Sequence, residues 1–253
     1  MGAPEQEPAG PEEDPDTATP HDRPMSLVDH LSELRTRIFW AILAWAAASV
    51  ACYFYTPKFL ELVRPLLGKD AILIFTAPTE AFFAYLTLAM VAGIFVASPV
   101  ILYQILMFVL PGLTVRERRW LLLMMPMAML LFVAGLAFAY YAVLPVTMGF
   151  FMSYATPDLK PQIKIGDFLG FVQGILLLLG VVFQLPLVLL FLANLGIVNS
   201  RSLSRHRRIA LFGSFLVSAV VTPTPDAMTC IVVALPLWLL FEVSLVLMRL
   251  TGK

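Results

Sequence analysis

Long apolar runs separated by short polar loops recur along this chain, from about residue 38 to residue 248. The chain has 253 residues, of which 60% are hydrophobic and only 13% are charged. Because a helix needs about 20 apolar residues to cross a bilayer, these runs predict membrane spans rather than the core of a water-soluble domain. The sequence therefore predicts an all-α polytopic membrane protein. Its six expected transmembrane helices lie at about residues 38–55, 81–110, 121–144, 166–194, 209–221 and 227–248.

The fifth expected helix is short. Residues 209–221 come directly before the polar segment 222–226, and at about 1.5 Å per residue such a helix covers roughly 20 Å. The hydrocarbon core of a bilayer is about 30 Å thick. We therefore expect the last two helices to form a shallow hairpin, with a thinned bilayer or a protein cover around its turn.

The beginning of the chain differs in composition from the rest. Residues 1–24 are rich in proline, glutamate and aspartate and offer almost nothing apolar to bury. This composition is typical of a disordered segment, and it lacks the basic start and apolar centre of a secretory signal. We expect a disordered acidic tail over 1–24 and a six-helix transmembrane domain over 25–253. Leu27, Leu31 and Leu34 recur at helical spacing and predict an amphipathic surface helix that runs into the first span.

The basic residues are unevenly divided between alternate loops. If both termini face the cytoplasm, the cytoplasmic segments hold twelve of the 17 lysines and arginines and the external loops hold five. This asymmetry follows the positive-inside rule and predicts cytoplasmic termini. The twelve are Arg23, Arg35, Arg37, Arg116, Arg118, Arg119, Arg201, Arg205, Arg207, Arg208, Arg249 and Lys253; the five are Lys58, Arg64, Lys69, Lys160 and Lys164.

Motifs typical of enzymes are absent from the sequence. The three histidines, His21, His30 and His206, lack metal-ligand spacing, and no nucleophile elbow, Walker loop or zinc-protease motif occurs. Cys52 and Cys230 lie inside apolar runs and form no motif. We therefore expect no catalysis, no cofactor, no metal and no nucleic-acid partner.

A few polar residues lie inside the apolar runs. For Gln104, Gln173 and Gln184 the favoured interpretation is interhelical hydrogen bonding. Glu242 lies about two turns from the end of the sixth expected helix, and an unpaired charge there costs a few kcal/mol in lipid. It is therefore either functional or paired with a loop arginine, and the sequence leaves both open. The glycines of the fourth expected helix, Gly166, Gly170 and Gly174, repeat every four residues and predict a smooth face for close helix contact.

Two acids stand among arginines at the expected cytoplasmic surface. Glu33 precedes the first span and has Arg37 four residues later, a pair worth a few tenths of a kcal/mol. Glu117 lies between Arg116 and Arg118 in the loop after the second span. Each acid alone is more typical of a solvated surface. If the fold brings the two together, they form a pair of acceptors for guanidinium groups, which bind carboxylates bidentately.

Several segments resemble, in order, the signatures of the TatC family, the polytopic subunit of the twin-arginine protein translocase. The strongest is F-V-L-P-G-L-T-V-R-E-R-R at 108–119. The resemblance covers about residues 26–249. The other segments are H-L-S-E-L-R-T-R at 30–37, A-P-T-E-A-F at 77–82, S-P-V-I-L-Y-Q at 98–104, G-L-A-F-A-Y at 135–140, F-Q-L-P at 183–186 and T-P-T-P-D at 222–226.

The resemblance implies six helices in a concave, glove-like arrangement, with the last two short, in the cytoplasmic (inner) membrane. It implies a receptor for the twin-arginine signal peptides of folded precursor proteins. The energy source would be the proton-motive force, and single-span TatA- and TatB-type subunits would complete a homo- or hetero-oligomer in the lipid bilayer.

The resemblance places the family's motif glutamates at Glu33 and Glu117 and its motif phenylalanine at Phe108, and we add further candidates from their positions in the chain. Glu33, Glu117, Phe108 and Arg119 are the expected signal-peptide-binding residues. Gln184, Glu242 and Asp226 are the expected partner-docking or intramembrane polar residues. Gln184 and Thr87 stand where relatives often carry Glu and Lys, so a fixed charge at these two positions is not required.

The alternative function is a secondary transporter of a small solute. Such a protein predicts inverted repeats and broken helices around an ion site at the bilayer midplane. The two halves of this chain show no evident repeat, and the apolar runs hold almost no charge. An intramembrane enzyme is also disfavoured, because no nucleophile–base pair is present.

Overall fold

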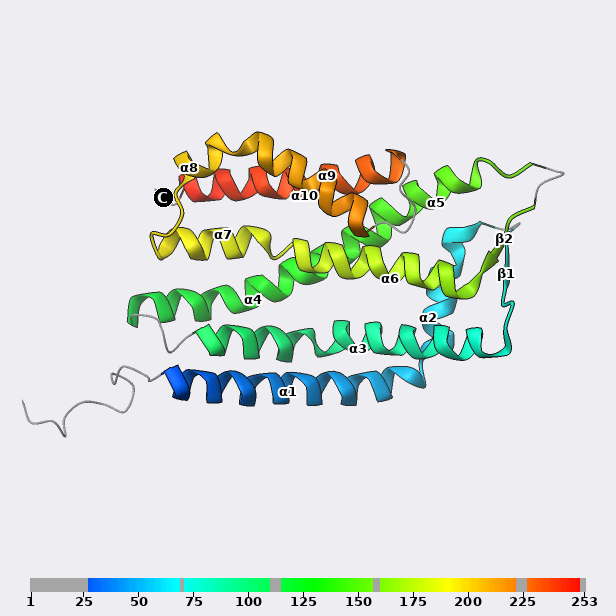
Figure 1. Ribbon diagram of the computed structural model, residues 1–253, viewed down its shortest axis with the longest axis horizontal. Coiled ribbons are helices and arrows are strands. Elements are labelled where there is room, and N and C mark those ends of the chain that lie inside the picture. Colours follow the sequence, from blue (N-terminus) through cyan, green and yellow to red (C-terminus); the bar gives the residue numbers. More distant parts are fainter. Residues whose placement is uncertain (1–26, 69–70, 110–114, 157–159, 222–226, 251–253) are drawn as a thin grey trace, which may run out of the picture.

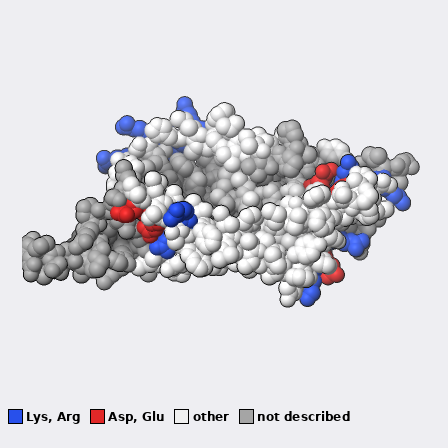
Figure 2. Space-filling model, turned by 60° about the horizontal axis from the view of Figure 1, so that its bottom comes forward, with Lys and Arg blue, Asp and Glu red and all other residues white. Residues whose placement is uncertain are grey.

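The computed structural model describes residues 27–68, 71–109, 115–156, 160–221 and 227–250. Within these ranges, only the backbone is described at residues 27, 115–120, 123 and 221. The long helices run side by side along the long axis of the molecule (Figure 1). At one end lie the start of the first helix and the helix α8, and at the other end lies a two-stranded sheet. On the face shown in Figure 2 the charged groups gather at these two ends, and the belt between them is uncharged. This distribution suits a protein that spans a bilayer.

The first two long helices, α1 (Leu27–Tyr53) and α3 (Pro78–Val109), pack directly against each other. A Cβ atom added at Gly93 would lie only 2.7 Å from Cα of Ser49, so the glycine permits close contact of the two backbones. The indole of Trp45 donates a hydrogen bond to the carbonyl oxygen of Met90 at 2.9 Å. These contacts fix how far α1 is displaced along α3.

The third helical segment extends further than the sequence predicts. It comprises α4 (Val115–Phe138), the π-helical turn η3 (Ala139–Val143) and α5 (Leu144–Met152). The expected helix end at 144 is wrong, because Pro145 lies in the first turn of α5. A proline has no amide hydrogen to donate, and the wider π turn directly before it accommodates the missing bond without ending the helix.

The fourth expected helix, by contrast, is divided. Helix α6 (Ile165–Val182) ends before Phe183, and α7 (Leu185–Asn194) begins one residue after Gln184, with Pro186 in its first turn. The prediction of close contacts along Gly170 and Gly174 is wrong, since a Cβ atom at either would meet nothing within 4 Å.

The closely packed glycine of this helix is a different one. A Cβ atom at Gly180 would lie 2.9 Å from the ring of Phe132, which joins α6 to α4.

The end opposite α8 is closed by short elements. Helix α2 (Thr56–Val63) and the 3-10 turn η1 (Arg64–Leu67) follow α1. Strand β1 (Ile72–Ile74) pairs in parallel with β2 (Gln162–Lys164), with Leu73 opposite Ile163. A buried apolar cluster lies between these elements and the long helices; it includes Leu67, Leu88, Leu144, Phe168, Val172, Leu179 and Val233.

The last part of the chain forms α8 (Ser200–Arg205), α9 (Arg207–Val221) and α10 (Ala227–Leu250). The expectation that both last helices are short is wrong for the sixth, because α10 has 24 residues. Helix α9 has 15 residues. In the described part of the chain, five helical segments are long and apolar enough to cross a membrane: Val28–Tyr53, Pro78–Val109, Met124–Met152, Ile165–Asn194 and Ala227–Leu250.

The Gly93 contact gives a test of the α1–α3 packing. Gly93→Ala places a methyl group against the backbone of Ser49, which cannot move aside as a side chain can. We expect the free energy of unfolding to fall by about 1–3 kcal/mol, measured by thermal unfolding of the purified protein in detergent. Gly174→Ala, in open space inside α6, is the control and should leave stability unchanged or raise it by up to about 1 kcal/mol, because alanine favours a helix more than glycine does. Equal stability of both variants would contradict the close approach.

Candidate functional site

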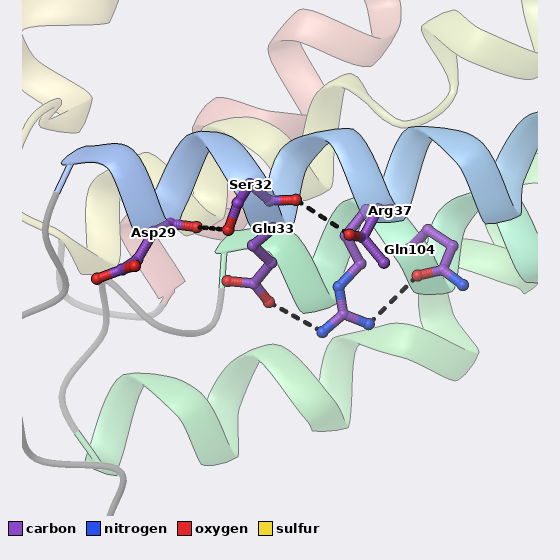
Figure 3. A network of polar contacts seen from close by, with 6 residues as sticks. Asp29, Ser32, Glu33, Arg37 and Gln104 are labelled. Atoms are coloured by element: carbon purple, nitrogen blue, oxygen red, sulfur yellow. Dashed lines mark hydrogen bonds and ion pairs between the residues drawn. The ribbon is translucent and has the colours of Figure 1, made fainter.

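A network of polar contacts joins α1 to α3 near the start of α1 (Figure 3). The guanidinium of Arg37 donates from Nη2 to Oε1 of Glu33 at 2.9 Å, one turn earlier on α1. It also donates from Nη1 to Oε1 of Gln104 on α3 at 3.3 Å. The side chains of Arg37 and Glu33 are only 26% and 19% exposed. The i,i+4 pair expected from the sequence is therefore present, and it is extended to a second helix by a glutamine.

The second carboxylate oxygen of Glu33 is in an unusual position. Oε2 is buried and has no hydrogen-bond partner among the residues that the structure describes. A buried carboxylate oxygen without a donor is costly, by about 1–3 kcal/mol or more for a charged group. Since Oε1 is already bound to Arg37, Oε2 is the carboxylate oxygen of Glu33 that has no donor within the described part of the chain.

An aromatic pair lies one turn further toward the start of α1. The ring of His30 stacks on the ring of Phe108, with centroids 4.4 Å apart and planes 19° from parallel. His30 precedes Glu33 by three residues and Phe108 follows Gln104 by four, so each pair lies on one face of its helix. The antiparallel contact of α1 with α3 thus brings Phe108 to the same site as Glu33.

The other residues predicted for signal-peptide binding are only partly described. Glu117 and Arg119 belong to the first turns of α4, but their side chains lie outside the described residues. Asp226 also lies outside them. The convergence of Glu117 on Glu33 stays a prediction.

An apolar cavity of about 470 Å³ lies between α3, α4 and the α6–α7 segment. Two of its lining residues are polar, and each donates a hydrogen bond to a backbone carbonyl oxygen. The hydroxyl of Ser98 donates to Phe95 O at 2.7 Å, and Nε2 of Gln184 donates to Ala128 O on α4 at 3.0 Å. The interhelical hydrogen bond favoured for Gln184 is thereby present. The lining residues from α3 are Ile94, Ser98, Ile101, Leu102, Ile105, Leu106 and Val109; those from the other helices are Leu121, Met124, Ala128, Phe132, Val181, Gln184, Leu187, Val188, Phe191 and Leu192.

Glu242 on α10 is paired with an arginine. Its Oε2 lies 2.9 Å from Nη2 of Arg207, the first residue of α9, and the Glu242 side chain is 22% exposed. The sequence left open whether Glu242 is functional or paired with an arginine of the preceding basic segment, and the structure shows the ion pair. This pair joins the beginning of α9 to α10.

Two features of this site, the stacking of His30 on Phe108 and the partner of Gln104, do not follow from the sequence alone. The sequence predicts no role for His30, although it lies within the 30–37 motif that also holds Glu33 and Arg37. The interhelical hydrogen bond favoured for Gln104 is present, but the sequence does not identify its partner, Arg37, which is 67 positions away. The available signal was that both residues belong to the quoted motifs, and the register of α1 against α3 was needed to join them.

The comparisons with known proteins agree over most of the chain. The family model for the Sec-independent protein translocase protein (TatC) matches residues 29–236. The TatC proteins of Carboxydothermus hydrogenoformans and Synechocystis sp. are each 38% identical to this chain; the alignments cover 88% and 92% of it, and 93% and 92% of the relatives. The chloroplastic TATC of Arabidopsis thaliana is 36% identical over 92% of this chain and 69% of its own.

A solved structure is similar as well. The crystal structure of a twin-arginine translocase receptor, TatC, superposes with a TM-score of 0.80 at 30% identity, over 88% of this chain and all of that one. The alternative of a small-solute transporter is not favoured by any of these matches. Because the family model and relatives above 30% identity span nearly the whole helical part, the chain belongs to the TatC family of Sec-independent protein translocase proteins.

Proposed function

We propose that this chain is the signal-peptide receptor and core subunit of a twin-arginine translocase, which exports folded proteins across the cytoplasmic membrane using the proton-motive force. Membership of the TatC family supports the translocase assignment, and the solved relative is named a twin-arginine translocase receptor. Both termini face the cytoplasm, in agreement with the distribution of basic residues. The end of the molecule that carries Glu33 is then the cytoplasmic end.

The observation that best supports the proposal is that Oε2 of Glu33 has no hydrogen-bond donor among the described residues. One arginine of the signal peptide donates to Oε2, which is buried and has no partner in the described part of the chain. Hydrogen bonds to charged groups contribute about 1.5–3 kcal/mol, and burial among helices strengthens them. Phe108 packs against the peptide beside this contact, next to the His30 ring.

A second acid is needed for the second arginine. Glu33 and Arg37 together carry no net charge, so the pair alone attracts a cationic peptide weakly. Glu117 supplies the additional carboxylate in this proposal, and Arg119 holds the first turn of α4 at the lipid headgroups.

The apolar part of the signal peptide lies in the cavity between α3, α4 and α7. On the last two turns of α3, Gln104 and Phe108 face α1, whereas Ile105 and Val109 line the cavity. The polar network and the cavity are therefore adjacent surfaces of one helix. A peptide whose arginines bind near Glu33 continues directly into apolar surroundings, where burial contributes about 25 cal/mol per Å².

The single-span partner subunits dock near Gln184 and the last two helices. Helix α9 is too short to cover the hydrocarbon core alone, at about 1.5 Å per residue. Asp226 and Glu242 are the further polar residues assigned to this surface.

The receptor site is tested by removing the charge of Glu33. Glu33→Gln keeps the shape of the side chain but not its charge, so binding of a twin-arginine peptide should weaken about tenfold or more. The measurement is photo-crosslinking or equilibrium binding of the peptide to the purified protein. Glu117→Gln is expected to have a similar effect.

Glu61→Gln, on α2 at the opposite end, is the matched control and should bind the peptide normally. Unchanged binding in both Glu33→Gln and Glu117→Gln, with unfolding temperatures like that of the unmodified protein, would refute the receptor assignment.

The docking role of Gln184 has its own test. Gln184→Leu removes the hydrogen bond to Ala128 O and should reduce co-purification of the single-span subunits and export of folded cargo, while peptide binding at Glu33 persists. Gln173→Leu, at a buried glutamine of α6 whose amide nitrogen has no hydrogen-bond partner among the described residues, controls for loss of a buried amide that makes no interhelical bond through that nitrogen. Normal recruitment and export by Gln184→Leu would assign that residue to packing alone.

A further inference from the structure

A cluster of arginines lies where α8 meets α9, outside the proposed receptor site. Arg201 and Arg205 are one turn apart on α8, and Arg208 lies in the first turn of α9. All three are exposed. In Figure 2 basic groups gather at the left end of the upper edge, where α8 lies in Figure 1.

The corner that presents these arginines is held in place by specific contacts. Asn199 caps α8 by accepting a hydrogen bond from Ser202 N at 2.7 Å. His206 separates the two helices, and its Nδ1 lies 2.8 Å from Ser202 O. Arg207 binds Glu242 of α10 at 2.9 Å. The arginines therefore stand on a fixed surface rather than on an unsupported loop.

Few acidic residues flank the cluster along the sequence. The sequence has no aspartate or glutamate between Asp167 and Asp226, and Glu242 is the one acid after that. Glu242 is bound to Arg207. Among the described residues, Arg201, Arg205 and Arg208 form no ion pair within 4.0 Å. Three exposed positive charges thus lie at the end of the molecule that carries α8.

Helix α9 has two faces that differ in their surroundings. One face packs against α10; it begins with Arg207 and includes the buried Ser214 and Ser218. Arg208 heads the opposite face. That exposed face continues with Ile209, Phe212, Leu216 and Val220, which are 65%, 69%, 55% and 77% exposed.

We propose that the cluster Arg201, Arg205 and Arg208 binds the phosphate headgroup of an anionic phospholipid whose acyl chains lie along the exposed face of α9. The pattern of arginines at the membrane end and apolar side chains directly below matches a phospholipid in both charge and polarity. Guanidinium groups bind phosphate oxygens bidentately. The site rests on membrane residence and the α8–α9 geometry, not on the receptor role.

The test uses the purified full-length protein in mixed micelles with equal amounts of dioleoyl-phosphatidylglycerol and dioleoyl-phosphatidylcholine. Native mass spectrometry counts each lipid bound. Each arginine near an anionic surface contributes roughly a fivefold preference, so Arg201→Gln/Arg205→Gln/Arg208→Gln should lower the ratio of bound phosphatidylglycerol to phosphatidylcholine at least about tenfold. A triple Arg→Lys variant at the same positions keeps the charge and should retain most of the preference.

The matched control removes three charges at the other end of the molecule, as Lys58→Gln/Arg64→Gln/Lys164→Gln, and should leave the ratio unchanged. Excess inorganic phosphate should not displace the lipid, because the acyl chains contribute to binding. An unchanged ratio in the arginine variant, an equal loss in the control, displacement by phosphate alone, or retention of a co-purified helical subunit instead of lipid would each overturn the proposal.

Discussion

One guanidinium group, that of Arg37, determines the geometry of the site. It lies between a carboxylate on its own helix and an amide on α3, and it uses a different nitrogen for each. These bonds require α1 and α3 to pack closely, which the contact of Gly93 with Ser49 permits. Because Arg37 occupies only one oxygen of Glu33, the burial that stabilises the pair leaves the other oxygen without a donor. The acceptor is therefore a consequence of the helix packing.

The prolines shape the rest of the molecule. Pro145 follows a π-helical turn that lets the third helical segment continue to Met152, whereas Pro186 begins a new helix after Gln184. The break between α6 and α7 places the Gln184 amide within hydrogen-bonding distance of α4. The apolar cavity lies beside this break, so the same irregularity supplies both the polar link and the space next to it.

Much of this arrangement follows from the sequence, because hydrocarbon length and apolar runs leave few choices for a chain so poor in charge. The helical class follows from these runs, and the pair of Glu33 with Arg37 follows from their spacing of four residues on one helix. The sequence alone does not show which prolines lie next to a helix break. Pro99, Pro126 and Pro236 lie inside continuous helices, whereas Pro186 lies in the first turn of α7, directly after the break between α6 and α7. Gly170 and Gly174 have the expected spacing, but close contacts form at Gly93 and Gly180. These outcomes depend on which residues a neighbouring helix presents, and that is a property of the packing.

The most direct measurement is the energetic coupling between Glu33 and the arginines of a bound signal peptide. A double-mutant cycle combines Glu33→Gln with replacement of one peptide arginine by glutamine, and compares the four binding constants. A direct hydrogen bond from a peptide arginine to Glu33 predicts a coupling of about 1.5 kcal/mol or more for one of the two arginines, as expected for a charged hydrogen bond. A coupling near zero for both arginines would contradict a direct contact with Glu33.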